Sequence, residues 1–528
     1  MATVRDVAFD VLRALDLTTV FGNPGSTELP FLKDFPADFT YVLGLQESVV
    51  VGMADGFAQA RRHAALVNLH TSAGLGNAMG AIITAYHNRT PLVVTAGQQD
   101  RKHLALEPLL SGRLTEIAAP YVKWSHEPAR AQDVPAALAR AYYMAMQDPQ
   151  GPVFVSIPMD DWDAEGAPCA VRAVSQRVAP DPALVTRVAD ALDGSKKPAL
   201  VAGGGIDRAG QDAWDAVVAL AEKLDADVWA DPIGGRAGFP QDHPLFRGHL
   251  APAQALIGMQ LAAYDVVLAL GAPVFLSYPY VPGAVVAESA TLFQITASPD
   301  EAAYATAGSS IVGDPGLGAA ALLLLVQGRP TASAEAGDAP ALPEKTTPMT
   351  VDYAMHMLAA ALPRDAVIAD EAISSKSKML KHLRARGPGS FYTSASGGLG
   401  FAMPAAVGLQ MATPRRQVVC VIGDGSSMYA IQALWTAAHR NLPIVFVAIN
   451  NGQYAILKAF SALIGTGEHV PGLDLPDIDL VAIARALGCD AETVVSPDDL
   501  APALQRALAS STPTLVNVLV DHTVPSLI

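Results

Sequence analysis

Apolar residues recur along the chain in two alternating patterns. Near the start, apolar residues with i, i+3, i+4 spacing form one helix face: Val4, Val7, Ala8, Val11, Leu12 and Leu15. Short β-branched runs then alternate with alanine-rich stretches, and the clearest runs lie at 41–45, 64–69, 92–96 and 153–157. Buried strands separated by helices are typical of a parallel sheet covered on both faces. The pattern therefore predicts an α/β fold built from doubly wound parallel sheets.

Two stretches without this periodicity divide the chain. Residues 163–182 mix small and polar residues, and residues 327–348 are rich in Ala, Pro, Gly, Glu and Thr, as linkers often are. Between them, apolar runs at 198–203 and 266–270 predict buried strands, and the strand–helix alternation resumes after residue 348. We therefore predict three α/β domains, at 1–165, 180–326 and 349–528.

Composition narrows the class of protein. A chain of 528 residues is too long for one core, which agrees with several domains. Asp and Glu outnumber Lys and Arg by 51 to 35, which gives a net charge of −16. So acidic a surface disfavours non-specific binding to nucleic acid or anionic membranes. The longest apolar run, near 319–326, is also too short to span a bilayer, so we predict neither kind of partner.

The cysteines and the first residues indicate the compartment. Cys169, Cys420 and Cys489 have no metal-binding spacing, and three cysteines cannot form a disulfide framework. Residues 1–17 carry three aspartates, unlike a secretory signal peptide. We therefore predict a reducing, cytoplasmic location.

The most specific chemical pattern lies in the third domain. A strand predicted at 417–422 leads directly into Gly423-Asp424-Gly425-Ser426, and a helix predicted at 429–440 follows. A second strand, at 443–449, ends in Asn450-Asn451. A right-handed βαβ crossover brings both strand ends to the same edge of the sheet, where ligands bind. Asp424 and Asn451 are therefore expected to converge.

These residues suit Mg²⁺, which prefers few, hard oxygen ligands and shares them with phosphate. We predict three metal ligands, namely the Asp424 carboxylate, the Asn451 amide oxygen and a main-chain carbonyl near Gln453. Gly425 lets the backbone approach closely, and the helix N-terminus beyond it favours an anion such as a diphosphate. Gly-Asp-Gly alone is also an ordinary tight turn. The Asn-Asn pair some two dozen residues later favours the metal–diphosphate interpretation.

Three polar residues mark one edge of the first domain. Ser26 lies in the segment 21–30 after a short strand, Glu47 opens a helix after the strand at 41–45, and His70 ends the strand at 64–69. Each has a simpler explanation by itself, since serine caps helices, glutamate is favoured in a first helical turn and a lone histidine is usually structural. Their coincidence at one carboxyl edge, in a chain with the metal pattern, favours a shared functional site.

With these motifs the chain resembles the thiamine-diphosphate (ThDP)-dependent 2-keto-acid decarboxylases, and most closely the benzoylformate decarboxylases. The resemblance runs nearly end to end, and its most specific stretches are 21–30 (FGNPGSTELP), 97–99, 160–162, 271–275 (GAPVF), 397–404 (GGLGFAMP), 423–426 and 433–438 (ALWTAA). It implies a pyrimidine-binding first domain, a middle domain and a diphosphate-binding third domain. It also implies ThDP with Mg²⁺, which Ca²⁺ can replace, an active site between subunits, and a homotetramer built as a dimer of dimers.

The resemblance also assigns roles to individual residues. Glu47 matches the glutamate that hydrogen-bonds the aminopyrimidine ring and favours the tautomer that deprotonates the thiazolium carbon. Ser26 matches a serine that binds the substrate carboxylate, and His70 a histidine that transfers protons. Leu399 matches an apolar wedge that bends the cofactor. The other implied cofactor contacts are Pro24, Gly25, Asn77, Ser374, Gly398, Gly425, Ser426, Tyr429 and Tyr454. The implied substrate-pocket residues are Leu109, Leu110, Ile456 and Phe460.

Two positions depart from the benzoylformate decarboxylase pattern. Tyr278 stands where those enzymes carry a second active-site histidine. Its unperturbed pKa of about 10, against about 6.5 for histidine, makes it a poorer proton shuttle at neutral pH. Ile456 stands where aryl-specific members tend to have a smaller residue. A narrower pocket is expected there.

The sequence leaves several functions open. The leading prediction is an enzyme, a lyase that decarboxylates an aryl or branched aliphatic 2-keto acid, without oxidation, to an aldehyde and CO₂. A carboligase of the acetolactate-synthase type is the first alternative, and a flavin-linked 2-keto-acid oxidase the second. A non-catalytic ThDP-binding protein is disfavoured by Glu47, since a pure binder needs no proton relay. A nicotinamide dehydrogenase is disfavoured because Gly203-Gly204-Gly205 is not the dinucleotide-binding pattern.

Overall fold

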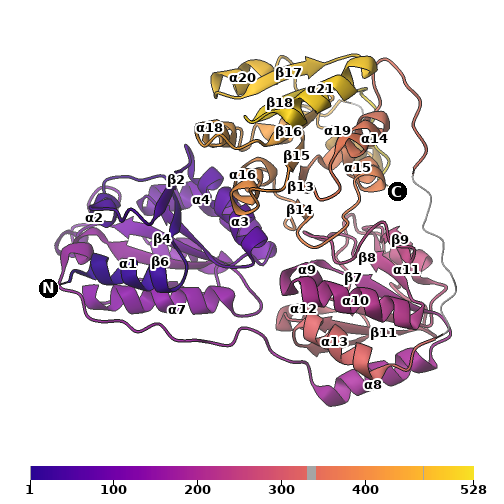
Figure 1. Cartoon of the computed structure of the whole chain (residues 1–528), viewed down its shortest axis with the longest axis horizontal. Coiled ribbons are helices and arrows are strands. Elements are labelled where there is room, and N and C mark those ends of the chain that lie inside the picture. Colours follow the sequence, from indigo (N-terminus) through magenta and orange to yellow (C-terminus); the bar gives the residue numbers. More distant parts are fainter. Residues whose placement is uncertain (1, 330–339, 468, 528) are drawn as a thin grey trace. The chain divides into compact units, whose positions relative to one another are not determined.

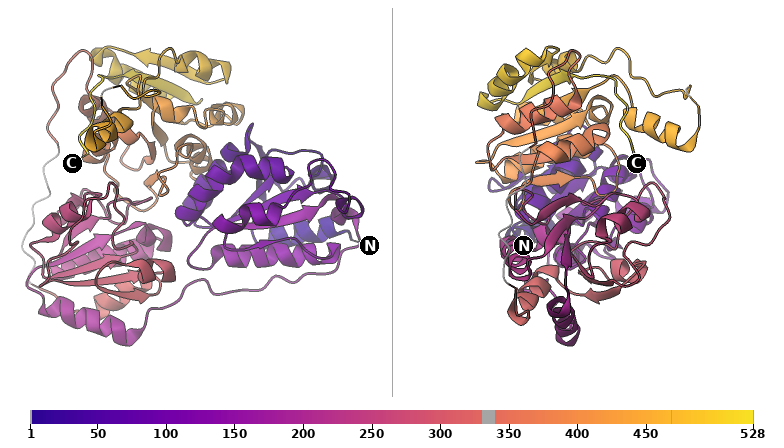
Figure 2. Two further views of the ribbon diagram at one scale, coloured as in Figure 1. Left: turned by 180° about the vertical axis from the view of Figure 1, so that it is seen from behind. Right: turned by 90° about the vertical axis from the view of Figure 1, so that its right-hand side faces the viewer.

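Three six-stranded parallel sheets form the framework of the protein (Figure 1). The computed structural model describes residues 2–329, 340–467 and 469–527. In each sheet the strands lie in one layer with helices against its faces, as the further views in Figure 2 also show. The predicted fold class is therefore confirmed. Part of the predicted linker at 327–348 lies outside the described residues.

The chain forms two compact units. The first comprises Met1–Ser175, Leu342–His382 and Ser396–Ile528, and the second comprises Gln176–Ala341 and Leu383–Ala395. The first unit therefore holds the first sheet and most of the third. The second unit holds the middle sheet.

The first sheet has the strand order β2-β1-β3-β4-β6-β5. Its strands are β1 (Thr19–Gly22), β2 (Thr40–Leu43), β3 (Ala65–Leu69), β4 (Leu92–Gln98), β5 (Ser125–His126) and β6 (Val153–Pro158). Its helices are α1 (Val4–Ala14), α2 (Leu29–Leu32), α3 (Glu47–Arg61), α4 (Thr71–His87), α5 (Arg101–Leu104), α6 (Leu114–Ala118) and α7 (Val134–Met146). The α1 helix begins at residue 4 because Thr3 and Asp6 form a capping box.

The middle sheet has the strand order β12-β11-β10-β7-β8-β9. Its strands are β7 (Pro198–Ala202), β8 (Asp227–Ala230), β9 (Phe246–His249), β10 (Val266–Leu270), β11 (Thr291–Thr296) and β12 (Ser309–Val312). Its helices are α8 (Pro182–Gly194), α9 (Gly204–Ala209), α10 (Gln211–Leu224), α11 (Gln254–Leu261), α12 (Pro299–Tyr304) and α13 (Pro315–Leu325).

The third sheet has the strand order β14-β13-β15-β16-β18-β17. Its strands are β13 (Val367–Glu371), β14 (Phe391–Thr393), β15 (Val418–Gly423), β16 (Val445–Asn450), β17 (Asp490–Val494) and β18 (Thr514–Leu519). Its helices are α14 (Val351–Ala361), α15 (Lys376–His382), α16 (Ala402–Ala412), α17 (Asp424–Ser427), α18 (Ala433–His439), α19 (Ala455–Ile464), α20 (Leu480–Ala486) and α21 (Pro497–Ala509).

The helix predicted at 429–440 was wrong at its start. In its place the structure has two helices, α17 and α18, with turns between them. Helical structure starts at Asp424, directly after β15. Gly423 keeps an extended backbone and is the N-cap of α17. The N-terminus of α17 therefore lies at the sheet edge, closer to Asp424 than the sequence indicated.

The first and third sheets share one strand order. Counted from the first strand of each, both read 2-1-3-4-6-5, whereas the middle sheet reads 6-5-4-1-2-3. In the two outer sheets the chain proceeds from its first strand to one side and then returns to build the other side. The carboxyl ends of β1 and β3, and of β13 and β15, therefore flank a topological switch point. Ligands bind at such points in open parallel sheets.

Helices α3 and α16 pack closely within the first unit (Figure 1). A Cβ atom on Gly56 would lie 2.2 Å from the Ala405 carbonyl oxygen, and one on Gly408 would lie 1.9 Å from the Met53 carbonyl oxygen. Only glycine allows backbones to approach this closely. Glu47 is the first residue of α3, and Leu399 lies just before α16. The contact between these two helices therefore links the segment that carries Glu47 to the segment that carries Leu399.

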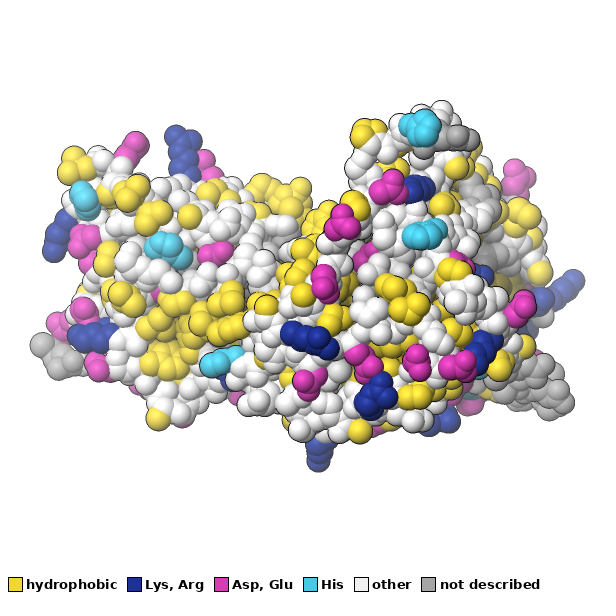
Figure 3. Space-filling view, turned by 90° about the horizontal axis from the view of Figure 1, so that it is seen from above, with side chains coloured by type: hydrophobic (Ala, Val, Ile, Leu, Met, Phe, Trp, Pro, Cys, Tyr) yellow, Lys and Arg dark blue, Asp and Glu magenta, His cyan; other side chains and the backbone are white. Residues whose placement is uncertain are grey.

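On the face drawn in Figure 3, Lys and Arg side chains stand scattered among acidic and apolar ones. Within the described part of the chain, no helix combines the length and apolar character needed to cross a membrane.

Candidate active site

Glu47 is held at the carboxyl edge of the first sheet. It is the first residue of α3, whose N-terminus is capped by the Gln46 side chain. The Glu47 side chain is 9% exposed, and its two oxygens accept hydrogen bonds from Asn23 Nδ2 (3.2 Å) and Asn77 Nδ2 (3.1 Å). Asn23 follows β1 and Asn77 lies in α4. Two amides from different elements therefore fix the orientation of this carboxylate.

His70 lies next to this cluster, directly after β3. Its Nδ1 atom is 2.9 Å from Glu28 Oε2 and 3.2 Å from Thr27 Oγ1, while the ring remains 21% exposed. The buried Glu28 carboxylate also accepts the N–H groups of Gly25 and Gly97, each at 2.9 Å. An ionised acceptor at Nδ1 keeps the proton on that nitrogen. The Nε2 atom therefore remains for exchange with a ligand.

Glu28 was missed by the sequence analysis. The only sequence signal was its place inside the segment 21–30, because its partners lie 42 and 69 residues further along the chain. Gly25 depends on the same contact, since a Cβ atom there would lie 2.1 Å from His70 Nδ1. The predicted contacts Pro24 and Ser26 are exposed at this edge. In the segment beyond β4, Leu109 is 86% exposed and Leu110 is half-buried.

A pocket of about 330 Å³ opens at the corresponding edge of the third sheet. It is bordered by the segments that follow the neighbouring strands β13, β15 and β16. Many of the predicted site residues meet there, namely Ser374, Leu399, Asp424, Gly425, Ser426, Tyr429, Asn451, Gln453, Tyr454 and Ile456. Gly398 and Phe460 are not among the described residues that line it. Gly398 donates its N–H to Ser396 Oγ (3.0 Å), and Phe460 is half-buried on α19.

The proposed metal ligands adjoin one another in this pocket. Asp424 is buried, and its carboxylate accepts the N–H groups of Gly425 (2.9 Å) and Gly452 (2.7 Å). Burial raises the pKa of Asp424. A buried carboxylate is stabilised in its ionised form by a bound cation, so the residues present fit a divalent metal.

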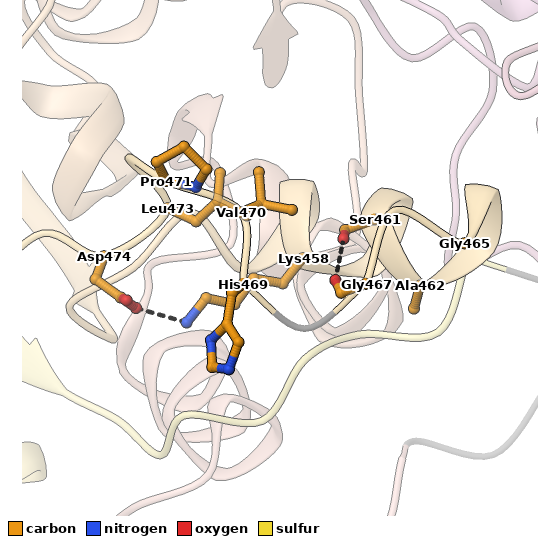
Figure 4. Close-up of a pocket in the computed structure, with 10 residues that line it drawn as sticks. All are labelled: Lys458, Ser461, Ala462, Gly465, Gly467, His469, Val470, Pro471, Leu473 and Asp474. Carbon is orange, nitrogen blue, oxygen red and sulfur yellow. Dashed lines mark hydrogen bonds and ion pairs between the residues drawn. The ribbon is translucent and has the colours of Figure 1, made fainter.

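The turn that carries Asn451 and Gln453 is fastened by residues that were missed. His522 Nδ1 lies 2.8 Å from the Asn451 carbonyl oxygen, and the His522 carbonyl oxygen accepts Gln453 Nε2 (2.9 Å). Lys458 on α19 donates to Gln453 Oε1 (2.5 Å) and to Asp474 Oδ1 (2.6 Å), the latter shown in Figure 4. These bonds engage both ends of the Gln453 side-chain amide and leave its main-chain carbonyl as the other oxygen at this position.

Lys458 also borders a second pocket, of about 770 Å³, formed by α19 and the segment after it (Figure 4). On the other side of the turn, a Cβ atom on Gly425 would lie 2.4 Å from Tyr454 Cε1. The Tyr454 ring therefore covers the backbone of the Gly-Asp-Gly turn. Burial, followed by the neighbouring Tyr429, raises the pKa of the Tyr454 hydroxyl.

The structure thus assembles two separate clusters. Among the described residues, no hydrogen bond joins Glu47 to any residue of the third domain. A smaller pocket, of about 210 Å³, lies between α3, α4 and the segment at 399–401. Leu399 and Tyr429 line both this pocket and the one at Asp424.

The switch point of the middle sheet is closed. Gly205 donates its N–H to the Gly271 carbonyl oxygen (2.9 Å), and a Cβ atom on Gly203 would lie 2.6 Å from the same oxygen. Beside it, Arg236 and Asp207 form a fully buried ion pair with Nη1 and Oδ2 3.2 Å apart. These contacts bring the segments that follow β7 and β10 close together. Tyr278, which follows β10 in this unit, has a side chain that is 66% exposed.

Comparisons with known proteins agree with this geometry. Residues 2–118 match the family model described as thiamine pyrophosphate enzyme, N-terminal TPP binding domain. Residues 185–322 match the central domain of the same enzymes, and residues 374–518 match their C-terminal TPP binding domain.

Individual relatives cover the whole chain. A benzoylformate decarboxylase of Pseudomonas aeruginosa is 45% identical over 526 residues, 98% of this chain and 99% of the relative. The acetolactate synthase isozyme 3 large subunit of Escherichia coli is 27% identical over 524 residues, 93% of this chain and 89% of the relative. The crystal structure of benzoylformate decarboxylase from Polynucleobacter necessarius superposes with a TM-score of 0.97 at 42% identity, covering 100% of both chains. The thiamine diphosphate-dependent 4-hydroxybenzoylformate decarboxylase of Rhodococcus jostii RHA1 gives 0.96 at 40% identity, covering 99% of this chain and 100% of the other.

Proposed function

The chain belongs to the thiamine pyrophosphate enzyme family, and on that premise we propose that it decarboxylates a 2-keto acid to an aldehyde and CO₂. One observation carries the proposal: a carboxylate oriented by two amides and a histidine oriented by a carboxylate share one sheet edge. A pure binding protein has no need of either arrangement. Benzoylformate-like and branched aliphatic acids are the substrate classes that we propose.

The third-domain pocket would hold the diphosphate end of the cofactor. Asp424, Asn451 and the main-chain carbonyl of Gln453 would hold Mg²⁺, for which Ca²⁺ can substitute. The pocket offers one carboxylate and otherwise neutral oxygens, which leaves metal coordination sites for diphosphate. ThDP, when bound, would supply the electron sink for the electron pair that stays on the substrate carbon when CO₂ leaves.

The chain's own residues would orient the reaction and move protons. Glu47 would accept a hydrogen bond from the aminopyrimidine, with its own orientation set by Asn23 and Asn77. Ser26 would bind the substrate carboxylate. His70 would exchange protons at Nε2 with the reacting substrate, because Glu28 holds the Nδ1 side. Tyr278 is proposed as a slower, second proton donor.

We further propose that the complete site forms between subunits of a homotetramer, built as a dimer of dimers. Glu47 and Asp424 lie in separate clusters of one chain. Leu109, in the segment after β4, is 86% exposed, and Tyr429, which lines the pocket at Asp424, is 55% exposed. A partner subunit would cover both. We also propose a cytoplasmic location, which agrees with three free cysteines.

Product analysis tests the proposed reaction. We expect purified protein with ThDP and Mg²⁺ to convert benzoylformate, 4-hydroxybenzoylformate or a branched aliphatic 2-keto acid into CO₂ and one equivalent of aldehyde. The same reactions with added aldehyde measure carboligation. If hydroxyketones predominate without added aldehyde, the carboligase alternative replaces the proposal, and if no acid is consumed, the non-catalytic alternative does. Flavin absorbance in the purified protein would favour the flavin-linked oxidase instead, and a colourless protein would count against it.

Ile456 is predicted to limit substrate width. It lines the pocket at Asp424, and its N–H is fixed on Ser374 Oγ (3.0 Å), so its backbone cannot easily recede. Crowding such a site costs about 1–3 kcal/mol. We therefore expect Ile456→Ala to raise the ratio of aryl to aliphatic 2-keto-acid turnover roughly tenfold or more. Ile464→Ala, exposed at the other end of the same helix, is the matched control. An unchanged ratio of kcat/KM values would show that residue 456 does not shape the pocket.

A further inference from the structure

The buried carboxylate of Glu371 binds the backbone beside Leu399. Glu371 ends β13, at the switch point of the third sheet, and is 0% exposed. Its Oε1 atom accepts the N–H of Gly400 (2.6 Å), and its Oε2 atom accepts those of Phe401 (2.8 Å) and Ala402 (2.6 Å). Hydrogen bonds to a charged acceptor are roughly twice as strong as those between neutral groups. The three bonds hold the two residues that precede α16 and satisfy the free N–H of Ala402, its first residue.

The segment held in this way carries an apolar side chain into the site. Leu399 immediately precedes the three donors and lines both the pocket at Asp424 and the smaller pocket between α3 and α4. Gly397 and Gly400, on either side, have φ values of 72° and 97°. Glycines with positive φ are conformationally permissive, so the local sequence does not fix the place of Leu399. Its position therefore depends on contacts from outside the segment.

We propose that Glu371 is a positioning residue for Leu399: its carboxylate anchors the backbone of residues 400–402 and thereby sets where the Leu399 side chain meets the cofactor. The inference rests on the proposed function in so far as ThDP occupies this pocket. An exposed helix cap would need no buried charge. A full carboxylate on the strand side of the segment, by contrast, fixes three consecutive peptide groups against a rigid sheet.

The charge of Glu371 gives this role a pH dependence. Burial raises its pKa to about 7, against the lowering effect of the three N–H groups, and Asp370 raises it further. The other titratable groups near it are Cys420 on β15, and Lys376, which pairs with Asp370 (2.8 Å). Helix α16 carries none. Protonation places a hydrogen on an oxygen that now only accepts, so the anchor weakens as the pH falls through about 7.

The same raised pKa changes folding stability in the opposite direction: stability falls, while the anchor strengthens, as the pH rises. A carboxyl group whose pKa is raised on folding stabilises the fold most fully below its ordinary pKa, and that contribution is lost as the pH rises through about 7. Positioning of Leu399 should therefore improve over the range in which folding stability declines slightly. If Glu371 served folding stability alone, the positioning of Leu399 would not improve over the pH range in which stability declines.

The test compares Glu371→Gln, Leu399→Ala and the double variant. An amide keeps the shape but turns one acceptor into a donor facing N–H groups. With ThDP and Mg²⁺ bound, we expect Glu371→Gln to slow exchange of the thiazolium C2 proton, followed by NMR, on the order of tenfold to a hundredfold. The exchange rate of the wild type should rise with pH through about 7, and that of Glu371→Gln should lose this step. Leu399→Ala should slow exchange similarly, and the double variant should be no slower than Leu399→Ala alone.

Asp370→Asn is the matched control, since Asp370 is equally buried and adjacent but bonds Lys376 and the Ala372 N–H instead. It should leave the exchange rate near that of the wild type. Additive losses in the double variant, or unchanged exchange in Glu371→Gln, would overturn the proposal. If Glu371→Gln fails to fold, Glu371→Asp, which retracts the carboxyl group from the three N–H groups, replaces it; it should slow the exchange similarly, be no slower in combination with Leu399→Ala, and keep a pH-dependent step. Exchange of the thiazolium C2 proton needs no substrate, so the experiment can be interpreted even if the protein consumes no 2-keto acid.

Discussion

Asp424→Ala protein is expected to retain neither Mg²⁺ nor ThDP. Asp424 supplies the one carboxylate among the proposed metal ligands, and the N–H groups of Gly425 and Gly452 donate to its two oxygens and fix them in the pocket. Replacing it leaves only neutral oxygens against a divalent ion and a diphosphate. We expect the affinity for ThDP in the presence of Mg²⁺ to fall on the order of a hundredfold or more. Thiamine and metal content after gel filtration, and calorimetric titration of the apoprotein, measure it.

For the apoprotein, we expect Asp424→Ala to cause no loss of thermal stability, in contrast to its effect on cofactor binding. Burial raises the pKa of Asp424, so an ionised carboxylate there costs free energy when no cation is bound. Apo Asp424→Ala should therefore melt no lower than the apo wild type, and only the wild type should be stabilised by ThDP and Mg²⁺. Asp490→Ala, an exposed aspartate at the start of β17, is the matched control. Normal retention of metal and ThDP by Asp424→Ala would show that the metal lies elsewhere.

Glu47→Gln is expected to keep its fold and its cofactor but to lose almost all proton exchange at the thiazolium C2. Asn23 and Asn77 now donate to the two Glu47 oxygens. Glutamine keeps only one of those acceptors, so one asparagine must turn away and the cofactor loses its charged partner. A loss on the order of a thousandfold is typical when a preorganised charge of this kind is removed. NMR of bound ThDP measures the exchange, and Glu116→Gln, an exposed glutamate on α6, is the control.

Mixing the two inactive variants tests the assembly. If Glu47 of one subunit serves the Asp424 pocket of another, each mixed dimer contains one site with both residues intact. Co-expression of Glu47→Gln with Asp424→Ala should then restore about one quarter of the wild-type activity. No recovery in verified mixed oligomers would mean that both residues act within one chain.

Most of the fold could be predicted because its central strands are buried on both faces. The run at 266–270 predicted β10 with the bounds that the structure has, and the runs at 92–96 and 153–157 fell inside β4 and β6. The edge strand β5 is two residues long and polar, so it carried no periodic signal. Strands at a sheet edge bury too little surface to constrain their sequence.

The residues of the candidate site could be predicted only where they belong to local sequence motifs. Asp424 and Asn451 were found because a βαβ unit carries both, and the pocket brings them together. The partners Glu28, Glu371 and His522 were missed. Each acts through hydrogen bonds to backbone groups far along the chain, as between Asn451 and His522, which are 71 positions apart. Such contacts arise from the tertiary fold and leave no spacing to recognise.

The shared strand order of the outer sheets has an evolutionary consequence. Two domains of one chain with the order 2-1-3-4-6-5 point to an ancestral gene that was duplicated and fused, with the differently ordered middle sheet inserted between the copies. The ancestor would have been a single domain that paired with itself. Divergence would then have left a carboxylate at a different place on the carboxyl edge of each copy, with Glu47 after the second strand of the first sheet and Asp424 after the third strand of the third sheet.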